Sequence, residues 1–189
     1  MDIKTRPRTL YGDWLEQYGA TWKTQLEQIR ARFGDALEET RTPEEYPTDV
    51  PIVYVRKDRV VEMMEFLKSE PGLEYSFLAD LTATDEEVEP RFEIVYNLYS
   101  KHKGPRIRVK ARVRDGEEIP TITSVWPGAN WAEREVYDMF GVRFTGHPDL
   151  RRILMDVRWE GHPLRKDYPL RGYQVFTSPE PVDTRLLED

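Results

Sequence analysis

The sequence of 189 residues contains no cysteine. A chain without thiols cannot form disulfides, bind zinc or an iron–sulfur cluster through sulfur, or supply a catalytic thiolate. Its apolar runs, such as residues 60–67 and 121–126, are far shorter than the roughly 20 residues that span a bilayer, and residues 1–10 lack the apolar core of a signal peptide. These absences favour a soluble or peripheral protein that is not secreted.

Sequence motifs that mark self-contained enzymes are also missing. The chain has no G-x-G-x-x-G nucleotide fingerprint, no G-x-x-x-x-G-K-[ST] phosphate loop, no G-x-S-x-G elbow and no H-E-x-x-H pair. An enzyme that works alone is therefore hard to build from this sequence.

Charge is distributed unevenly along the chain. The 28 basic and 35 acidic side chains give a net charge of -7, which argues against a general nucleic-acid binder. Residues 141–173 hold seven basic and four acidic side chains, a local charge of +3, so the rest of the chain carries -10. This basic segment could supply counter-charges to acidic residues of the same chain or of another subunit.

Hydrophobic periodicity predicts the elements of an α/β fold of the α+β type. Apolar residues recur every three or four positions from Leu10 to Phe33, as expected of one helical face, although Gly19 could break that helix. Residues 40–51 include three prolines and are predicted to form an exposed connector. We place the start of the core domain after this connector.

The core domain is expected to begin with a short strand at 52–55 and a helix capped by Asp58. Residues 75–81 are a second candidate strand. The acidic residues 85–89 are most simply a solvated loop, with a docking patch as the alternative. Alternating apolar residues then predict an antiparallel hairpin over residues 92–113.

Four cations line one face of the second hairpin strand, namely Arg106, Arg108, Lys110 and Arg112. A nucleic-acid-binding face would need aromatic side chains between them for base stacking, and the strand has none. A solvated face, partly neutralised across the strands by residues such as Glu93, is the favoured interpretation.

A short helix is predicted between Asn130 and Gly141. Asn130 and Glu133 match a capping box, and Gly141 suits the left-handed residue that ends a helix. Glu135 and Asp138 share a face of this helix. Ion pairing of that face, to a partner or to the C-terminal segment, is favoured over general acid–base catalysis.

After Gly141 the chain repeats a phrase, GHPDLR at 146–151 and GHPLR at 161–165. The surrounding prolines and glycines predict an extended, turn-rich chain with little core of its own. A segment of this length without regular structure tends to be functional or disordered. We therefore expect residues 143–189, called the tail below, to be a strap that binds a large partner.

The histidines of the repeated phrase, His147 and His162, could form a metal site with Asp149 and Asp167. Against this interpretation, a proline follows each histidine, no helix fixes the ligands at an i, i+4 spacing, and no supporting hydrogen-bond partner is evident. A local role for each His-Pro turn is simpler.

Residues 131–170, WAEREVYDMFGVRFTGHPDLRRILMDVRWEGHPLRKDYPL, closely resemble the signature of the C subunit of the proton-pumping NADH-quinone oxidoreductases, respiratory complex I. So many fixed residues over about 40 positions make a chance match negligible. Residues 155–158 depart from the pattern, because relatives more often have a proline and an acidic residue before the tryptophan. This departure concerns the shape of one turn and leaves the resemblance intact.

The resemblance implies a small mixed sheet with flanking helices and a long extended C-terminal tail. Residues 1–45 match no known family, and their helix is predicted from periodicity alone. We divide the chain into an N-terminal helical extension (1–45), an α/β core domain (46–142) and a tail (143–189) that docks on partner subunits.

The resemblance further implies a non-catalytic structural subunit of the hydrophilic arm, peripheral on the cytoplasmic side of the cell inner membrane, that packs on the quinone-site D subunit and near iron–sulfur subunits. The parent complex passes electrons from NADH through FMN and iron–sulfur clusters to quinone and translocates protons. This chain is expected to bind no cofactor, no metal and no nucleic acid, and to meet the membrane only through the complex. The residues expected at the partner interface are Trp131, Glu133, Arg134, Glu135, Asp138, Gly141, His147, Leu150, Ile153, Trp159, His162, Arg165, Lys166, Asp167 and Tyr168.

Several alternatives stay open. Related subunits occur in membrane-bound hydrogenases, in F420H2 dehydrogenases and in ferredoxin-plastoquinone machinery, and the sequence does not choose firmly among them. A stand-alone metal-dependent hydrolase would use His147 and His162. A nucleic-acid-binding module would use the cations of residues 106–112 and would bind in a salt-sensitive way.

Overall fold

The computed structural model describes residues 14–102, 104–172 and 174–178. A five-stranded mixed sheet forms its centre, in the strand order β1-β2-β5-β4-β3. β2 and β5 are parallel, whereas the other neighbours are antiparallel. The strands are β1 (Leu37–Arg41), β2 (Ile52–Val55), β3 (Phe77–Asp85), β4 (Phe92–Tyr99) and β5 (Arg106–Val113).

Three α-helices and a second, two-stranded sheet complete the fold. A 3-10 turn, η1 (Lys57–Arg59), leads into the second helix, and β6 pairs with β7 in parallel. The bounds are α1 (Trp14–Phe33), α2 (Val60–Ser69), α3 (Ala129–Phe140), β6 (Glu118–Pro120) and β7 (Arg143–Thr145). In the part of the chain that the structure describes, no helix is long and apolar enough to cross a membrane. The predicted mixed fold with an N-terminal helix is confirmed.

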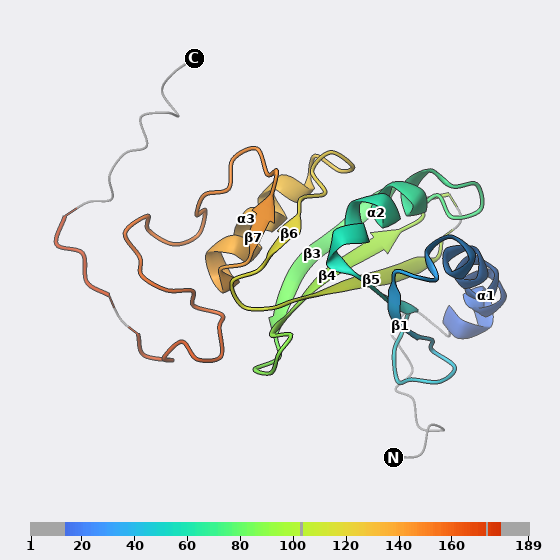
Figure 1. Ribbon diagram of the computed structural model, residues 1–189, viewed down its shortest axis with the longest axis horizontal. Helices are drawn as coiled ribbons and strands as arrows, with labels where there is room; N and C mark the ends of the chain where they lie inside the picture. Colours follow the sequence, from blue (N-terminus) through green and yellow to red (C-terminus); the bar gives the residue numbers. More distant parts are fainter. Residues whose placement is uncertain (1–13, 103, 173, 179–189) are drawn as a thin grey trace.

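One hydrophobic core joins the three helices to a single face of the large sheet (Figure 1). Alternate residues of β4 and β5 are buried in it, as their period-two pattern predicted. The helical residues in this core are Leu26, Ile29 and Phe33 of α1, Val60, Met63, Met64 and Leu67 of α2, and Val136, Met139 and Phe140 of α3. α1 therefore packs on the same core as the strands that follow it, and the division of the chain at residues 45 and 142 stays a prediction.

The structure corrects the N-terminal predictions in three places. α1 runs through Gly19 without a break, and the start of the predicted helix, residues 10–13, lies outside the described residues. The connector begins later than expected, since Thr40 and Arg41 belong to the edge strand β1. Asp58 does not cap α2, because its carboxylate accepts hydrogen bonds from Arg56 (2.8 Å) instead.

Two further elements differ from the sequence prediction. β3 extends to Asp85, so the acidic run begins inside a strand, and the Asp85 side chain is fully buried. Residues 143–145, predicted as part of the extended tail, form β7 because β6 offers them a parallel partner. The segment without helix or strand therefore starts at Gly146.

The opposite face of the sheet carries the predicted row of cations. Each cation has a partner on another strand or on an aromatic ring. Lys110 lies 2.6 Å from Glu93, Arg112 lies 2.8 Å from Glu39 and Arg108 lies 2.9 Å from Asn97, while Arg106 lies over the rings of Trp14 and Tyr99. The prediction of a partly neutralised face is confirmed. A nucleic acid would have to displace these partners, which counts against the nucleic-acid alternative.

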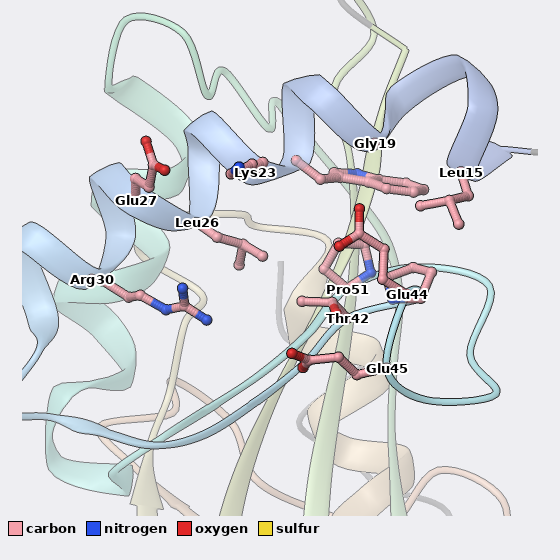
Figure 2. A pocket seen from close by; sticks show the side chains of 12 residues that line it. Leu15, Gly19, Lys23, Leu26, Glu27, Arg30, Thr42, Glu44, Glu45 and Pro51 are labelled. Carbon is pink, nitrogen blue, oxygen red and sulfur yellow. The ribbon is translucent and has the colours of Figure 1, made fainter.

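The hollows on the surface of the described residues include the following two. The first, of about 170 Å³, lies between α1 and residues 42–51, where Leu15, Leu26 and Pro51 line it (Figure 2). The second, of about 370 Å³, lies between the start of β3 and the start of α3, and Asp80 is the one charged side chain among its lining residues. Pockets for organic ligands measure roughly 300–1,000 Å³ and combine apolar walls with several placed polar groups. Neither hollow has both properties.

Candidate functional site

The described part of the tail, residues 143–172 and 174–178, runs past α3 and has no helix or strand after β7 (Figure 1). α3 ends at Gly141, whose φ of 78° is the left-handed conformation that glycine adopts without strain. A side chain there would also collide with the His162 ring, because an added Cβ would lie 2.6 Å from it. The predicted helix end is confirmed, and the close approach of the ring gives Gly141 a second reason to be glycine.

The second GHP phrase caps the C-terminal end of α3. The last carbonyl groups of a helix have no partner within the helix. Here the tail supplies partners for three backbone carbonyl oxygens. His162 Nδ1 lies 2.9 Å from the carbonyl oxygen of Asp138, the Leu164 N–H donates to that of Met139 (3.0 Å), and Arg165 Nε donates to that of Phe140 (2.7 Å). Burial lowers the pKa of His162, which favours the neutral form of its ring.

The Asp138 carboxylate is fully buried and holds the middle of the tail. Its Oδ2 accepts hydrogen bonds from three successive backbone N–H groups, those of Ile153 (3.0 Å), Leu154 (2.8 Å) and Met155 (3.0 Å). Its Oδ1 accepts one from Arg152 at 2.8 Å. Successive N–H groups form a concave anion site, and charge-assisted bonds of this kind are roughly twice as strong as neutral ones. The predicted pairing of Asp138 is thus made within the chain.

Arg134 binds the tail from the same helix. Its guanidinium is buried and donates to the carbonyl oxygens of Arg151 (3.1 Å) and Arg152 (3.3 Å). It also lies 5.1 Å from the ring centre of Trp131. Burial is the main reason that the pKa of Arg134 is lowered. Because its polar atoms face the tail, this cation positions the tail rather than presenting its charge to solvent.

Glu133 does not form the predicted capping box. α3 begins at Ala129 behind Gly128 with no side-chain cap. The Glu133 carboxyl is buried and instead accepts hydrogen bonds from the Ile122 N–H (2.8 Å) and the Thr121 hydroxyl (2.5 Å). Burial raises the pKa of Glu133 to about 7, although these two hydrogen bonds act in the opposite direction.

The first GHP phrase lies against the N-terminal half of α3. His147 Nδ1 accepts a hydrogen bond from the Asp149 N–H (3.0 Å), so the ring proton belongs on Nε2. Nε2 lies 3.2 Å from the backbone carbonyl oxygen of Asn130 and 3.9 Å from the Glu133 carboxyl. The two phrases therefore hold opposite ends of α3.

An ion network fixes the far part of the tail. Arg91 contacts Asp85 (2.8 Å), Asp115 (3.1 Å) and Asp167 (2.8 Å), and Arg165 also reaches Asp115 (2.5 Å). The Lys166 N–H donates to Asp85 at 2.9 Å. Arg91 is the main reason that the pKa of Asp85 lies well below its usual range. No local pattern in the sequence predicts this network, because it joins two turns of the sheet to the tail.

The remaining predicted residues differ in exposure. Trp131, Glu135, Lys166 and Asp167 are exposed, whereas Leu150, Ile153, Trp159 and Tyr168 are partly buried. Leu150 packs on the hydrophobic core, the Trp159 ring lies 6.3 Å from that of Phe176, and the Tyr168 hydroxyl donates to Gly172 (3.2 Å). The predicted set is therefore gathered on α3 and the tail, but only part of it faces solvent.

The geometry gives the metal alternative no support. His147 and His162 bind carbonyls of Asn130 and Asp138, which stand about 12 Å apart along α3 at 1.5 Å per residue. Asp149 pairs with Arg151 and Asp167 with Arg91. Among the described residues, no group of three or more histidine, aspartate or glutamate side chains is placed to hold a metal ion.

Comparison with known proteins identifies the family. The family model for the 30 kDa subunit of respiratory-chain NADH dehydrogenase matches residues 53–174, which is more than half of the chain. The chain belongs to this family. Among its relatives, the C 2 subunit of the NADH-quinone oxidoreductase of Rhizobium etli is 47% identical over 152 residues, covering 80% of this chain and 79% of the relative. The C subunit of the Roseiflexus sp. enzyme is 47% identical over 154 residues, covering 80% and 86%.

A solved structure has the same fold. A chain of the membrane-bound sulfane sulfur reductase, an archaeal respiratory membrane complex, matches with a TM-score of 0.65 and 27% identity, covering 79% of this chain and 86% of the archaeal one. The resemblance found in residues 131–170 is therefore confirmed. The matched region also contains every predicted interface residue, although the family model begins after α1 and β1.

Proposed function

We propose that this chain is a non-catalytic structural and assembly subunit of the hydrophilic arm of NADH-quinone oxidoreductase, and that α3 and the tail dock on the quinone-site D subunit and on neighbouring iron–sulfur subunits. In that complex electrons pass from NADH through FMN and iron–sulfur clusters to quinone, coupled to proton translocation. The chain would lie peripherally on the cytoplasmic side of the inner membrane, held there by the complex. Membership of this family of respiratory-chain subunits supports a place in such an assembly.

The distribution of exposed apolar side chains carries the docking proposal. Six of the nine large apolar side chains that are exposed in the described residues belong to α3 or the tail: Trp131, Leu154, Val157, Leu164, Leu170 and Val175. Trp131 is 66% exposed and Leu154 61% exposed. Concentration of such side chains in one region marks a protein–protein contact, where aromatic anchors contribute most of the affinity.

The polar contacts that hold the tail on the rest of the chain, called clamps below, favour binding because they keep these exposed side chains in fixed positions. Leu154 is flanked by two of the N–H groups that bind Asp138, and the N–H of Leu164 caps α3. A surface that is ordered before binding loses less conformational entropy when a partner arrives. This differs from a strap that orders only on its partner, which loses that entropy on binding.

The parent complex's cofactors are assigned to other subunits under this proposal. A chain without cysteine cannot ligate an iron–sulfur cluster through sulfur, and its sequence has no dinucleotide fingerprint. What remains for this chain is to add contact area and to position its neighbours.

A pull-down tests the proposal. The tagged full chain would be isolated from its native membranes in mild detergent, and the co-purifying subunits identified by mass spectrometry. We expect the quinone-site and iron–sulfur subunits, together with NADH-dependent quinone reduction. Replacing Trp131, Leu154 and Leu164 with serine should lower recovery of these subunits at least about tenfold, because buried anchors dominate interface affinity.

A matched control uses an exposed apolar residue elsewhere. Val88, which is 68% exposed in the loop between β3 and β4, should tolerate Val88→Ser with no loss of partners. Unchanged recovery in the triple variant would contradict docking through α3 and the tail. Recovery of wild type alone from the soluble fraction would contradict the assembly role itself.

The archaeal structure supports other parent complexes as alternatives. Because a chain of similar fold occurs in a sulfane sulfur reductase, this chain could serve as the equivalent subunit of a membrane-bound hydrogenase or of an F420H2- or ferredoxin-linked oxidoreductase. The same pull-down separates these cases, since a nickel–iron subunit and hydrogen oxidation would indicate the hydrogenase branch.

A further inference from the structure

The outer strand beside α3 has an unpaired edge. β3 is the last strand of the large sheet and runs next to α3 (Figure 1). An outer strand directs half of its backbone N–H and C=O groups away from the sheet. Within the described residues, the backbone of residues 77–85 forms hydrogen bonds with β4 and with no other segment. The edge of β3 therefore offers a row of free donors and acceptors.

The hollow of about 370 Å³ lies along this edge. Five consecutive residues of β3, 77–81, line it. Because alternate residues of a strand point to opposite faces, a hollow lined by consecutive residues flanks the edge of the strand and not one face. The opposite wall is the turn before α3 and the first turn of that helix, with Trp126, Gly128 and Ala132. The hollow and the β3 edge over residues 77–81 are called the edge groove below.

The far wall of the edge groove is fixed, but it is not filled. The Trp126 indole N–H donates to the carbonyl oxygen of Ser76 (3.3 Å), and Lys68 lies 5.6 Å from the Trp126 ring centre. At Gly128 an added Cβ would have no other atom within 4 Å. An organic ligand would need several placed polar side chains, whereas an added strand binds through the main-chain groups that the edge already offers. The groove therefore suits an extended peptide segment.

The side chains of the groove select the kind of segment. Phe77 is 43% exposed, and the sequence of residues 77–81, FLADL, contains one charge. Asp80 is exposed and has no ion-pair or hydrogen-bond partner among the described residues. The other outer strand, β1, has the sequence LEETR, whose charges are typical of an edge protected against pairing. The β3 edge lacks that protection, and it complements a segment with apolar side chains and a cation opposite Asp80.

A second copy of this chain fits the edge groove less well. Antiparallel self-pairing centred on residues 79–81 would place the two Asp80 side chains opposite or diagonal to each other, where like charges repel. The net charge of -7 on each copy adds to that repulsion. The bulge of β3 between Leu78 and Asp80 also interrupts the regular ladder, so a strand that binds here must match the bulge. These features favour a specific partner of a different sequence.

We propose that the edge groove binds an extended segment of a neighbouring subunit, which adds a strand to the sheet at β3, places apolar side chains in the hollow and pairs a lysine or arginine with Asp80. The inference rests on the proposed function, since it names how one partner is held. The groove is continuous with the proposed docking surface, because Ala132 lines it and the exposed Trp131 precedes Ala132 on α3.

Photo-crosslinking in the assembled complex tests the edge groove. A tagged chain with Phe77→p-benzoylphenylalanine would be made in its native host, irradiated and isolated in mild detergent, with Val88→p-benzoylphenylalanine as the exposed control. We expect position 77 to crosslink to one extended segment of another subunit, with a lysine or arginine close by in that segment, and position 88 to give no such product. Amides of residues 77–81 should exchange at least about tenfold more slowly in the complex than in the free chain.

Charge reversal on the two outer strands gives a matched comparison. Asp80→Lys should lower recovery of the crosslinked subunit about tenfold or more, because it turns an attraction into a repulsion. Glu38→Lys reverses an exposed carboxylate on β1 and should leave recovery unchanged. Gly128→Leu adds a side chain to the groove wall at a φ of -64° that suits any residue, and it should also lower recovery.

The outcomes separate this proposal from the proposed function. If neighbouring subunits co-purify with wild type but position 77 crosslinks to none of them, or only to a second copy, the edge groove is wrong and the proposed function stands. Equal recovery in Asp80→Lys and Glu38→Lys would also overturn the groove. If no subunit co-purifies with wild type, the proposed function fails, and the groove fails with it.

Discussion

The sheet domain and the tail of this chain are held in place by different forces. The sheet and its helices share one apolar core, in which side chains such as Ile94, Met63 and Leu67 have no exposed surface. The described tail from Gly146 onward has no helix or strand, and most of its attachments are hydrogen bonds or ion pairs. Two of its apolar residues, Leu150 and Met155, pack against the core.

This difference predicts two kinds of opening. Apolar burial is non-directional and shared by many residues, so a domain built on it unfolds as a unit. Each polar clamp depends on a few atoms at defined distances, so one clamp can open while the others persist. The tail should therefore open in pieces at free energies below that of global unfolding.

The largest effect is expected from a change in the core. Phe33 of α1 is fully buried, with its ring 5.4 Å from that of Phe66. Phe33→Ala should lower the free energy of unfolding by about 3–5 kcal/mol, because it removes buried apolar surface and leaves a cavity. Urea denaturation followed by circular dichroism measures this. A loss below about 1 kcal/mol would mean that α1 is not part of the core.

A change in the central clamp should act on the tail alone. In Asp138→Asn an amide nitrogen would replace one carboxylate oxygen, either the one that accepts from Arg152 or the one that accepts from three N–H groups. We expect a local loss of about 3 kcal/mol, or roughly 100-fold faster hydrogen exchange at the amides of residues 153–155. Amides of β4 should keep their protection. Equal acceleration in β4 would contradict the idea that the tail opens separately.

A pH-dependent effect of intermediate size is expected from Glu133. Its pKa is about 7 in the folded chain and about 4.5 as an ordinary carboxyl, so the folded chain binds the extra proton between these values. Stability should therefore fall as pH rises through this window, by about 2–3 kcal/mol, and not change further above it.

Denaturation at about pH 5 and about pH 8 checks this prediction. The difference in the free energy of unfolding between the two pH values should be smaller by about 2–3 kcal/mol in Glu133→Gln. In Glu135→Gln it should equal that of wild type. A pH response that Glu133→Gln leaves intact must come from another group.

The smallest effect is expected on the cationic face of the sheet. Arg112 contacts Glu39 at 2.8 Å and Glu38 at 3.3 Å, and about a quarter of its side chain is exposed. Arg112→Gln should change the free energy of unfolding by less than about 1 kcal/mol, since partly solvated ion pairs contribute little. Thermal denaturation with and without added salt measures it. A loss of stability well above this range would show that the ion pairs of this face contribute substantially to the free energy of unfolding.

Local patterns in the sequence predicted the elements whose causes are local. The strands β4 and β5, the buried face of α2 and the role of Gly141 all follow from periodicity or backbone preference within a few residues. The edge strand β1 was missed, because its sequence LEETR has no alternating apolar pattern. The short strands β6 and β7 depend on each other although the whole of α3 separates them in the sequence, and no local pattern records such a pairing.

The sequence predicted which residues form the candidate site but not how their side chains are arranged. The resemblance of residues 131–170 identified the family, and the comparisons confirmed it. The roles of Glu133 and Asp138 could not be read from spacing. The spacing of Glu133 from Asn130 fits a capping box. In the fold, however, its carboxyl accepts hydrogen bonds from Thr121 and Ile122, which lie more than ten residues away in the sequence. The partners of Asp138 are backbone N–H groups, which every sequence offers and which only folding brings together.

The parallel pairing of β2 with β5 also has a consequence for synthesis. β2 leaves the ribosome on the order of 50 residues before β5, and until then the edge of β2 that faces β5 has no partner. The antiparallel hairpin of β4 and β5 can form as soon as both are made, but the sheet cannot close around β2 earlier. An unpaired strand edge favours aggregation of a nascent chain. β1 covers only the other edge of β2, so the edge that faces β5 stays uncovered until β5 has been made.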